Sequence, residues 1–346
     1  MHLDLTDRKI LHELDINSRQ HTAEIAKKLR ISKQVAGFRI DRLLKEEIIS
    51  SFHAIIDVSK LGFSIHKVFL RLQNADTKKE LLILKFLSDN PNIVWVASCD
   101  GKYDLAFGTW AKDMAYLDRT MKEMNKKMED FISEKQVAPI VRGEYFIRDY
   151  LIESEAAHPM TRTRPYTLLL RSQSAMRKSF FGSEPLPAKI DAIDWKILFE
   201  LGKNARSTSV GIAEAVSISA DAVADRIRKL EKSGIVKHYN IVPNEAKYPY
   251  MHYKILIGLK NLTEIQERHL EEYCRMHPNI VYIVKTLGPW EFEIDVEIEN
   301  PQKLRELMMD LKTRFKDIIK DYSSLSIHQV HKYNFCPSVQ VQSDYK

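Results

Sequence analysis

The sequence predicts an α+β protein made of two tandem units, each a winged helix-turn-helix followed by a ferredoxin-like βαββαβ domain. Three observations predict this fold. They are an internal repeat at a fixed offset, helical spacing of apolar residues at the start of each unit, and alternating strand and helix patterns in the remainder. With 346 residues, 44% of them apolar, the chain is long enough for several compact domains.

The internal repeat emerges when the sequence is shifted by 187 positions without a gap. The shift aligns residues 7–11 (DRKIL) with 194–198 (DWKIL), 17–19 (NSR) with 204–206 (NAR), and 91–94 with 278–281, both PNIV. We therefore expect winged helix-turn-helix domains at 1–57 and 190–244, βαββαβ ligand and dimerisation domains at 62–153 and 249–336, a basic bridge at 154–189, and a tail at 337–346.

The first part of each unit has the pattern of three helices. Thr6 is the expected N-cap of a first helix that ends before Asn17, residues 22–29 form a second, and Ser32 caps a third. A short helix, a tight turn and a longer helix constitute a helix-turn-helix. In the third helix we expect these residues to point largely inward: Val35, Phe38, Ile40, Leu43 and Leu44. Residues 48–49 and 52–56 are expected to be the strands of a wing.

The second part of each unit changes to an order of strand, helix, strand, strand, helix, strand. In the first unit this order spans residues 66–147, and in the second unit residues 251–330. It predicts an antiparallel sheet with both helices on one face. The other face must be buried, and pairing with a second such sheet is the natural solution in a unit of this size.

The bridge and the cysteines give further expectations. Residues 154–189 hold six Lys or Arg against two Asp or Glu, but they also contain the apolar segments 166–170 and 180–181. We therefore expect a partly docked strap, with a solvated basic linker as the alternative.

Three cysteines without C-x-x-C spacing argue against a cysteine zinc site and suit a reducing cytoplasm. We expect no metal and no cofactor. The sequence has no apolar run of 18 residues, and its first residues are charged, so neither a membrane span nor a signal peptide is expected.

The third helix of the first unit has the composition of a DNA-recognition helix. A net charge of +6 mildly favours an anionic partner, and residues 19–53 hold eight cations against four anions. Glutamine bonds adenine bidentately, whereas lysine reaches guanine or phosphate. The predicted DNA-binding residues of this copy are Ser32, Lys33, Gln34, Arg39, Arg42 and Lys45.

The second copy is expected to read DNA less well. Its corresponding helix starts with Asp221 and Asp225, and carboxylates there repel phosphate, although one could accept from cytosine N4. Its predicted DNA-binding residues are Arg226, Arg228 and Lys229, either as a backbone clamp or in an element retained for structure.

A turn recurs between the second and third strands of each sheet, as DGKYD at 100–104 and LGPWE at 287–291. Glycine there suits a tight hairpin because it tolerates positive φ. A ligand role for the turn is a further hypothesis.

These motifs resemble those of the Lrp/AsnC family of feast/famine regulators, both in their order along the chain and in their occurrence in each of the two units. The signatures are D-x-x-I-L, N-x-R, I-S at 31–32 and 218–219, R-I-x-x-L-x-x-x-x-I-I (ending in I-V in the second unit), P-N-I-V and G-x-Y-D or its variant G-x-W-E, and they cover both units in a tandem-duplicated, archaeal-type form. The resemblance implies a regulator that binds double-stranded DNA, with an amino-acid-like effector bound by the second, RAM-type domain. It implies effector residues Gly101, Tyr103 and Asp104, with Gly288, Trp290 and Glu291 in the second unit, where Pro289 and Glu291 depart from the commoner pattern.

The duplication allows one chain to supply both halves of a pseudo-dimer, which could assemble into homo-oligomers. We expect its two helix-turn-helix units to address major-groove faces about 34–36 Å apart or a multiple of that.

Two alternatives stay open. Siroheme decarboxylases resemble this family in both domains and carry an R-H-x-x-G-F stretch after the helix-turn-helix. Residues 51–54 (SFHA) and 237–240 (KHYN) keep His53 and His238 but lack the Arg-His pair and its continuation, so we expect no enzyme and no catalytic residues. The other alternative is a module that binds effectors or proteins but not DNA.

Overall fold

The computed structural model describes residues 3–152, 178–182 and 188–336. The apolar segment 166–170 of the bridge and the predicted tail at 337–346 lie outside the described residues.

Each unit begins with three helices and one strand. In the first unit these are α1 (Leu5–Ile16), α2 (Thr22–Leu29), α3 (Lys33–Lys45) and β1 (Ile49–Ile56); in the second they are α7 (Ala192–Lys203), α8 (Ser209–Val216), α9 (Ala220–Lys232) and β7 (Val236–Pro243). The predicted cap Thr6 is wrong. Asp4 caps α1, since its side chain accepts from the backbone N–H of Asp7 while the Asp7 carboxylate accepts from the N–H of Asp4. Ser32 caps α3 as predicted.

The wing is built jointly by the two units. The predicted strands at 48–49 and 52–56 are one strand, β1, and its antiparallel partner is β7 of the other unit, with His53 opposite Asn240. Two backbone hydrogen bonds flank this ribbon symmetrically: Ser18 N–H donates to the Tyr239 carbonyl, and Ala205 N–H to the Phe52 carbonyl, both at 3.0 Å.

The ferredoxin-like parts contain eight strands and four helices. The first unit has β2 (Ser64–Leu72), α4 (Thr77–Asp89), β3 (Ile93–Asp100), β4 (Leu105–Ala111), α5 (Met114–Met128) and β5 (Ile132–Tyr145). The second has β8 (Met251–Leu259), α10 (Glu264–Met276), β9 (Ile280–Thr286), β10 (Phe292–Ile298), α11 (Pro301–Arg314) and β11 (Ile319–Tyr333). Short 3-10 turns lie at Val58–Leu61, Glu129–Phe131 and Asp149–Leu151.

The two sheets join at their edges and close on themselves. The strand order is β2-β4-β3-β11-β8-β10-β9-β5, and β5 also pairs with β2, so eight strands form a barrel. The seams between units are β3 with β11 and β5 with β9. The expected pairing of two sheets is therefore confirmed, in the form of edge-to-edge closure. Part of the predicted strap is also present, because β6 (Lys178–Phe181) adds to β5.

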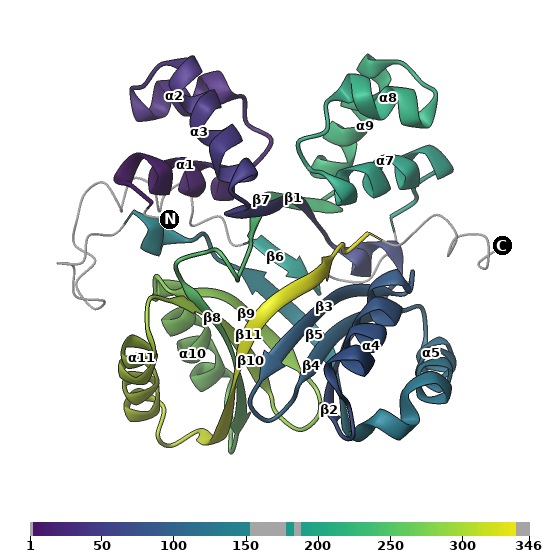
Figure 1. The fold of residues 1–346 in the computed structure, drawn as a ribbon, viewed down its shortest axis with the longest axis vertical. Coiled ribbons are helices and arrows are strands. Elements are labelled where there is room, and N and C mark those ends of the chain that lie inside the picture. The colour runs from purple at the N-terminus through teal and green to yellow at the C-terminus, as the bar shows by residue number, and fades with distance from the viewer. Residues whose placement is uncertain (1–2, 153–177, 183–187, 337–346) are drawn as a thin grey trace.

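Each helix-turn-helix lies above the barrel half that belongs mainly to the other unit (Figure 1). Helices α1–α3 stand over β8, α10 and α11, while α7–α9 stand over α4 and α5. The largest apolar core cluster joins these layers, because it includes Leu11 of α1, Leu198 of α7, Ile55 of the ribbon and Trp95 of the barrel. The ribbon, the helices and the barrel thus share one core.

Candidate functional site

The start of α3 presents an exposed surface. Lys33 and Gln34 are exposed in its first turn, whereas the Ser32 hydroxyl accepts from the backbone N–H of Val35 at 3.1 Å. The prediction that Val35 and Phe38 point inward is wrong, since they are 42% and 67% exposed. The buried face of α3 instead consists of Ala36, Ile40 and Leu43, which lie at helical spacing and place positions 35 and 38 outside.

The arginines of α3 are held by α1. Arg39 contacts Asp4 at 2.7 Å and Asp7 at 2.8 Å, and Arg42 donates to both Asp7 oxygens at 2.7 Å. Hydrogen bonds to these two carboxylates raise the pKa of Arg39. Lys45 is exposed at the last turn. Arg39 and Arg42 therefore hold α3 against α1. Of the predicted DNA-binding residues of this helix, Lys33, Gln34 and Lys45 remain exposed.

Helix α9 is held in its helix-turn-helix by the same kind of ion pairs, but it presents a different outer surface. Arg226 contacts Asp191 at 2.8 Å and Asp194 at 2.7 Å, as Arg39 does in the first unit. Arg228 pairs with Asp225, and Lys229 is exposed. Asp221 and Asp225 occupy the outward positions that Gln34 and Phe38 hold in α3. The two helix-turn-helix units lie at the same end of the molecule (Figure 1).

The predicted effector residues meet at the turns of the barrel. The ring centroids of Tyr103 and Trp290 are 6.3 Å apart, and both rings pack against Phe69. Gly101 and Gly288 have φ values of 130° and 137°. The acids bind backbone: Asp104 accepts from Leu72 N–H at 2.7 Å and Glu291 from Leu259 N–H at 2.6 Å. These contacts are structural, and the effector role stays a prediction.

The two histidines of the decarboxylase windows lie in the wing ribbon. Both are buried, and burial lowers the pKa of His53 to about 3. His53 packs edge-on against Tyr333, with ring centroids 4.4 Å apart. The ring of His238 is 2.8 Å from the carbonyl of Asp15. Both side chains thus take part in packing between the ribbon and the layers beside it.

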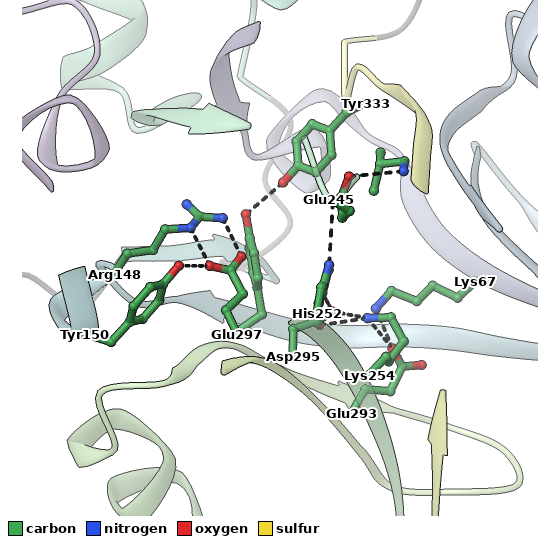
Figure 2. Close-up of polar contacts among 12 residues, drawn as sticks. Lys67, Arg148, Tyr150, Glu245, His252, Lys254, Glu293, Asp295, Glu297 and Tyr333 are labelled. Atoms are coloured by element: carbon green, nitrogen blue, oxygen red, sulfur yellow. Dashed lines mark hydrogen bonds and ion pairs between the residues drawn. The ribbon is translucent and has the colours of Figure 1, made fainter. Parts of the chain in front are cut away.

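Beneath the ribbon lies a buried cluster of charges that the sequence interpretation missed. Alternate residues of β10 supply three buried acids: Glu293, Asp295 and Glu297. Lys254 contacts both Asp295 oxygens at 2.7 Å, and Lys67 binds Glu293 (Figure 2). Burial lowers the pKa of Lys67. Burial also opposes the charge on Lys254, but the neighbouring Asp295 and Glu293 hold its pKa above the usual value.

His252 of β8 lies between two acids of this cluster. Its ring is 2.9 Å from Asp295 and 3.7 Å from Glu245. Burial opposes its protonation, but hydrogen bonds to Asp295 and Glu245 raise its pKa to about 9. His252 is therefore a cation at neutral pH.

Arg148 connects this cluster to the first helix-turn-helix. Its guanidinium contacts both Glu297 oxygens at 2.8 Å and an Asp15 oxygen at 2.6 Å, and all three residues are buried. Tyr150 also donates to Glu297 (Figure 2). Burial raises the pKa of Asp15, whereas Arg148 outweighs burial and lowers that of Glu297. A continuous polar connection thus runs from β10 to α1.

A cavity lies between the ribbon and this cluster. The cavity volume is about 80 Å³, enough for several waters. Its apolar wall includes Ile55, Ile140 and Val242, and its polar wall is made of Lys67, Arg148, Glu245, His252, Lys254, Asp295 and Glu297. The turn residues predicted to bind an effector are not among its lining.

Within the described parts of the chain, no group of three or more His, Cys, Asp or Glu residues is arranged to hold a metal ion. None of the helices described there is both long enough and apolar enough to span a membrane.

Comparisons with known sequences match the single units. Residues 3–44 match the AsnC-type helix-turn-helix domain, and residues 190–237 a winged helix-turn-helix DNA-binding family. The HTH-type transcriptional regulator LrpB of Bacillus subtilis is 32% identical over 136 residues, which are 36% of this chain and 81% of LrpB. The leucine-responsive regulatory protein of Rhizobium meliloti is 28% identical over 143 residues, covering 41% of this chain and 92% of that protein.

Comparisons with solved structures also match the whole chain. Two structures of the siroheme decarboxylase NirDL, one with an iron-uroporphyrin III analogue, superpose with TM-scores of 0.56 and 0.58 at 12% and 11% identity. They cover 97% and 98% of this chain, and 94% and 96% of their own. These likenesses establish a shared tandem fold. Over single units the curated relatives are regulators, whereas over the full length the likeness at 11–12% identity shows the fold alone.

Proposed function

Because the chain belongs to the Lrp/AsnC family, we propose that it is a transcriptional regulator that binds double-stranded DNA sequence-specifically and responds to a small molecule. The observation that carries this proposal is the outer surface of α3, where Lys33 and Gln34 are exposed at the start of a complete helix-turn-helix. Side chains at that position reach base edges when the helix lies in the major groove. As a regulator, the chain would need no catalytic residue.

The ion pairs that hold α3 in place support DNA recognition as well. Arg39 and Arg42 are engaged by α1, so the helix is held rigidly while its first turn stays accessible. Recognition requires such preorganisation, because ordering a side chain on binding costs free energy.

Selection of genomic DNA fragments by the purified chain, followed by anisotropy titration on a selected duplex, tests this proposal. We expect one preferred sequence and an affinity that falls steeply with salt, since phosphate contacts release counterions. Absence of any preferred duplex would contradict DNA recognition. A salt-insensitive interaction with a protein would instead favour the module that binds no DNA.

A siroheme-decarboxylase-like enzyme is the second candidate, favoured by the full-length likeness to NirDL. Two features of this chain argue against a decarboxylase. The Arg-His pair is absent from both windows, and the cations that line the cavity contact acids, which leaves them poorly suited to a polycarboxylate macrocycle. Anaerobic incubation with siroheme, followed by mass spectrometry, decides between the two. Loss of carbon dioxide from siroheme would establish the enzyme.

A further inference from the structure

The apolar residues exposed on α3 belong to one stripe of that helix. Gln34, Phe38 and Asp41 follow one another at spacings of four and three residues, so their side chains leave the same face. Val35 lies three positions before Phe38 and widens the stripe by a second apolar side chain. Phe38 is 67% exposed and Val35 is 42% exposed. An apolar surface therefore lies next to Gln34 on the outer face of the recognition helix.

Packing does not account for this exposed apolar pair. The core face of α3 is formed by Ala36, Ile40 and Leu43. Within the described residues, neither Val35 nor Phe38 belongs to an apolar core cluster. Phenylalanine and valine are also weaker helix formers than alanine or lysine. Burial and helix propensity therefore leave the exposed ring unexplained.

The second unit provides an internal comparison. A shift of 187 positions maps Val35 onto Ala222 and Phe38 onto Asp225. Helix α9 has the same length as α3, 13 residues, and a serine caps each of them. The helix-turn-helix thus forms without an aromatic ring at this position. The ring is specific to the copy with the more basic surface.

Cations surround the apolar pair. Lys33 lies in the first turn of α3, which contains no acid, and Lys27 and Arg30 are exposed at the end of α2. Asp41 adds an acid to the stripe, but it interacts electrostatically with Arg206 of the second unit. A polyanion that also presents apolar groups therefore suits this surface.

DNA presents such apolar groups in its major groove. The 5-methyl group of thymine lies on the base edge there, and phenylalanine is one of the side chains that contact it. Four residues of an α-helix span about 6 Å, which is less than two base-pair steps of about 3.4 Å each. Gln34 and Phe38 thus address the same base pair or neighbouring ones.

We propose that Phe38 determines sequence specificity by packing its ring against the 5-methyl group of a thymine in the half-site contacted by α3, close to an adenine bonded by Gln34. The inference rests on the proposed DNA binding, and it adds the base that the first copy selects and the second does not. Asp225, at the corresponding position of α9, offers a methyl group no apolar contact, since a carboxylate accepts from cytosine N4 instead.

Single thymine-to-uracil replacements in a duplex selected by the full chain test this inference, because uracil pairs like thymine but lacks the methyl group. We expect one replacement to weaken binding about fourfold in anisotropy titrations, the contribution of one buried methyl-sized group. Phe38→Ala should bind the thymine and uracil duplexes with nearly equal affinity. Phe38→Leu keeps an apolar side chain and should retain part of the preference for thymine.

Asp225→Asn is the matched control. It changes the corresponding position of α9 without adding an apolar group, so it should leave the preference for thymine unchanged. Because Phe38 lies outside the core, its variants should fold, which circular dichroism verifies.

Three results would count against the inference, and they are distinguishable. A duplex that is bound specifically but tolerates every thymine-to-uracil replacement would overturn the role of Phe38 and leave the proposed function intact. An undiminished preference for thymine in Phe38→Ala would assign the methyl contact to another side chain and overturn it too. Absence of any preferred duplex would refute the proposed function and this inference together.

Discussion

At the scale of single residues, His53 shows how burial sets the protonation of the ribbon. Its ring is removed from water between β1 and Tyr333, and burial lowers its pKa to about 3. An unfolded chain instead protonates histidine near pH 6.5. Below pH 6.5 the unfolded state binds a proton at His53, whereas the folded state does not. The contribution of buried, neutral His53 to the free energy of unfolding is therefore present above pH 6.5 and is lost as the pH falls toward 3.

The variant His53→Asn should reduce the acid sensitivity of the fold. Asparagine occupies the corresponding position 240 in the second unit. Between pH 6.5 and pH 5 the wild type should lose about 2 kcal/mol more of its free energy of unfolding than this variant does. Urea titrations at both pH values measure the difference. His328→Asn, at an exposed site, should behave like the wild type, and equal acid losses in wild type and His53→Asn would show that His53 is protonated in the folded state.

Lys33, at the start of α3, and Lys229, in the last turn of α9, allow the two copies to be compared for DNA binding. Both are exposed on recognition helices, and neither has an ion pair within the described residues. Because α3 has a more basic surrounding surface than α9, Lys33→Gln should weaken binding to a selected duplex more than Lys229→Gln. The slope of log K against log salt should decrease by about one for Lys33→Gln. Anisotropy titrations over a salt series measure this, and a larger effect of Lys229→Gln would reverse the ranking of the two copies.

At the scale of elements, the turns at Gly101 and Gly288 differ in how much room they leave. A Cβ atom at Gly101 would lie 2.6 Å from the Ser324 carbonyl oxygen, whereas at Gly288 the nearest atom, the Val137 carbonyl oxygen, is 3.3 Å away. Both residues have positive φ, which costs about 1–3 kcal/mol for alanine.

We therefore expect Gly288→Ala to lose about 1–3 kcal/mol of stability, and Gly101→Ala to lose more, since its clash involves backbone of the neighbouring strand. Urea denaturation followed by far-ultraviolet circular dichroism compares the two. If both variants unfolded at the same urea concentration, the contact of the Gly101 turn with β11 would not be tight.

The sequence predicted some elements well for a physical reason. Helix α2 follows its apolar periodicity, so its bounds, Thr22–Leu29, agree with the predicted 22–29. The partner of β1 could not be predicted, because a strand with apolar residues on both faces does not specify which strand it pairs with. Val35 and Phe38 were misplaced since apolar side chains were assumed to be buried, although a recognition surface exposes some of them.

The acids of β10 were missed because alternating charge normally marks the solvent face of a strand. A signal was available in the repeat. The corresponding positions of β4 are Ala106, Gly108 and Trp110, a pattern typical of an inward face, so the three acids had to be buried as well. Of the predicted DNA-binding residues in the first unit, Lys33, Gln34 and Lys45 lie exposed on α3, and their role stays a prediction. The charged cavity could be recognised only once the barrel was known.

At the scale of the whole molecule, the units are interlocked and not merely linked. Three strand pairings cross between them, β1 with β7, β3 with β11, and β5 with β9. A protease site inserted into the bridge near residue 165 should therefore yield two fragments that stay together. We expect the cleaved protein to elute from a size-exclusion column in one peak at the volume of the uncleaved chain, and to give two bands on a denaturing gel. Separate elution of the fragments without denaturant would contradict the interlocked barrel.

Because the two units are interlocked, the distance between helices α3 and α9 is also fixed. The helix-turn-helix units stand on one ribbon and are fastened to it by matching backbone hydrogen bonds from Ser18 and Ala205. A single chain should thus contact two half-sites about one helical turn apart, 10–10.5 base pairs. Because α3 presents Gln34 where α9 presents Asp221, the two half-sites should differ in sequence.

Changing the spacing of a selected site tests this rigidity. Inserting about 5 base pairs turns the second half-site to the opposite face of the duplex, while about 10 base pairs return it to the same face. We expect the first insertion to lower affinity to that of one half-site. The second insertion should restore no more than part of it, because the ribbon cannot lengthen to follow the added turn. Equal affinity for all spacings, measured by anisotropy with one chain per duplex, would mean that only one helix-turn-helix reads DNA.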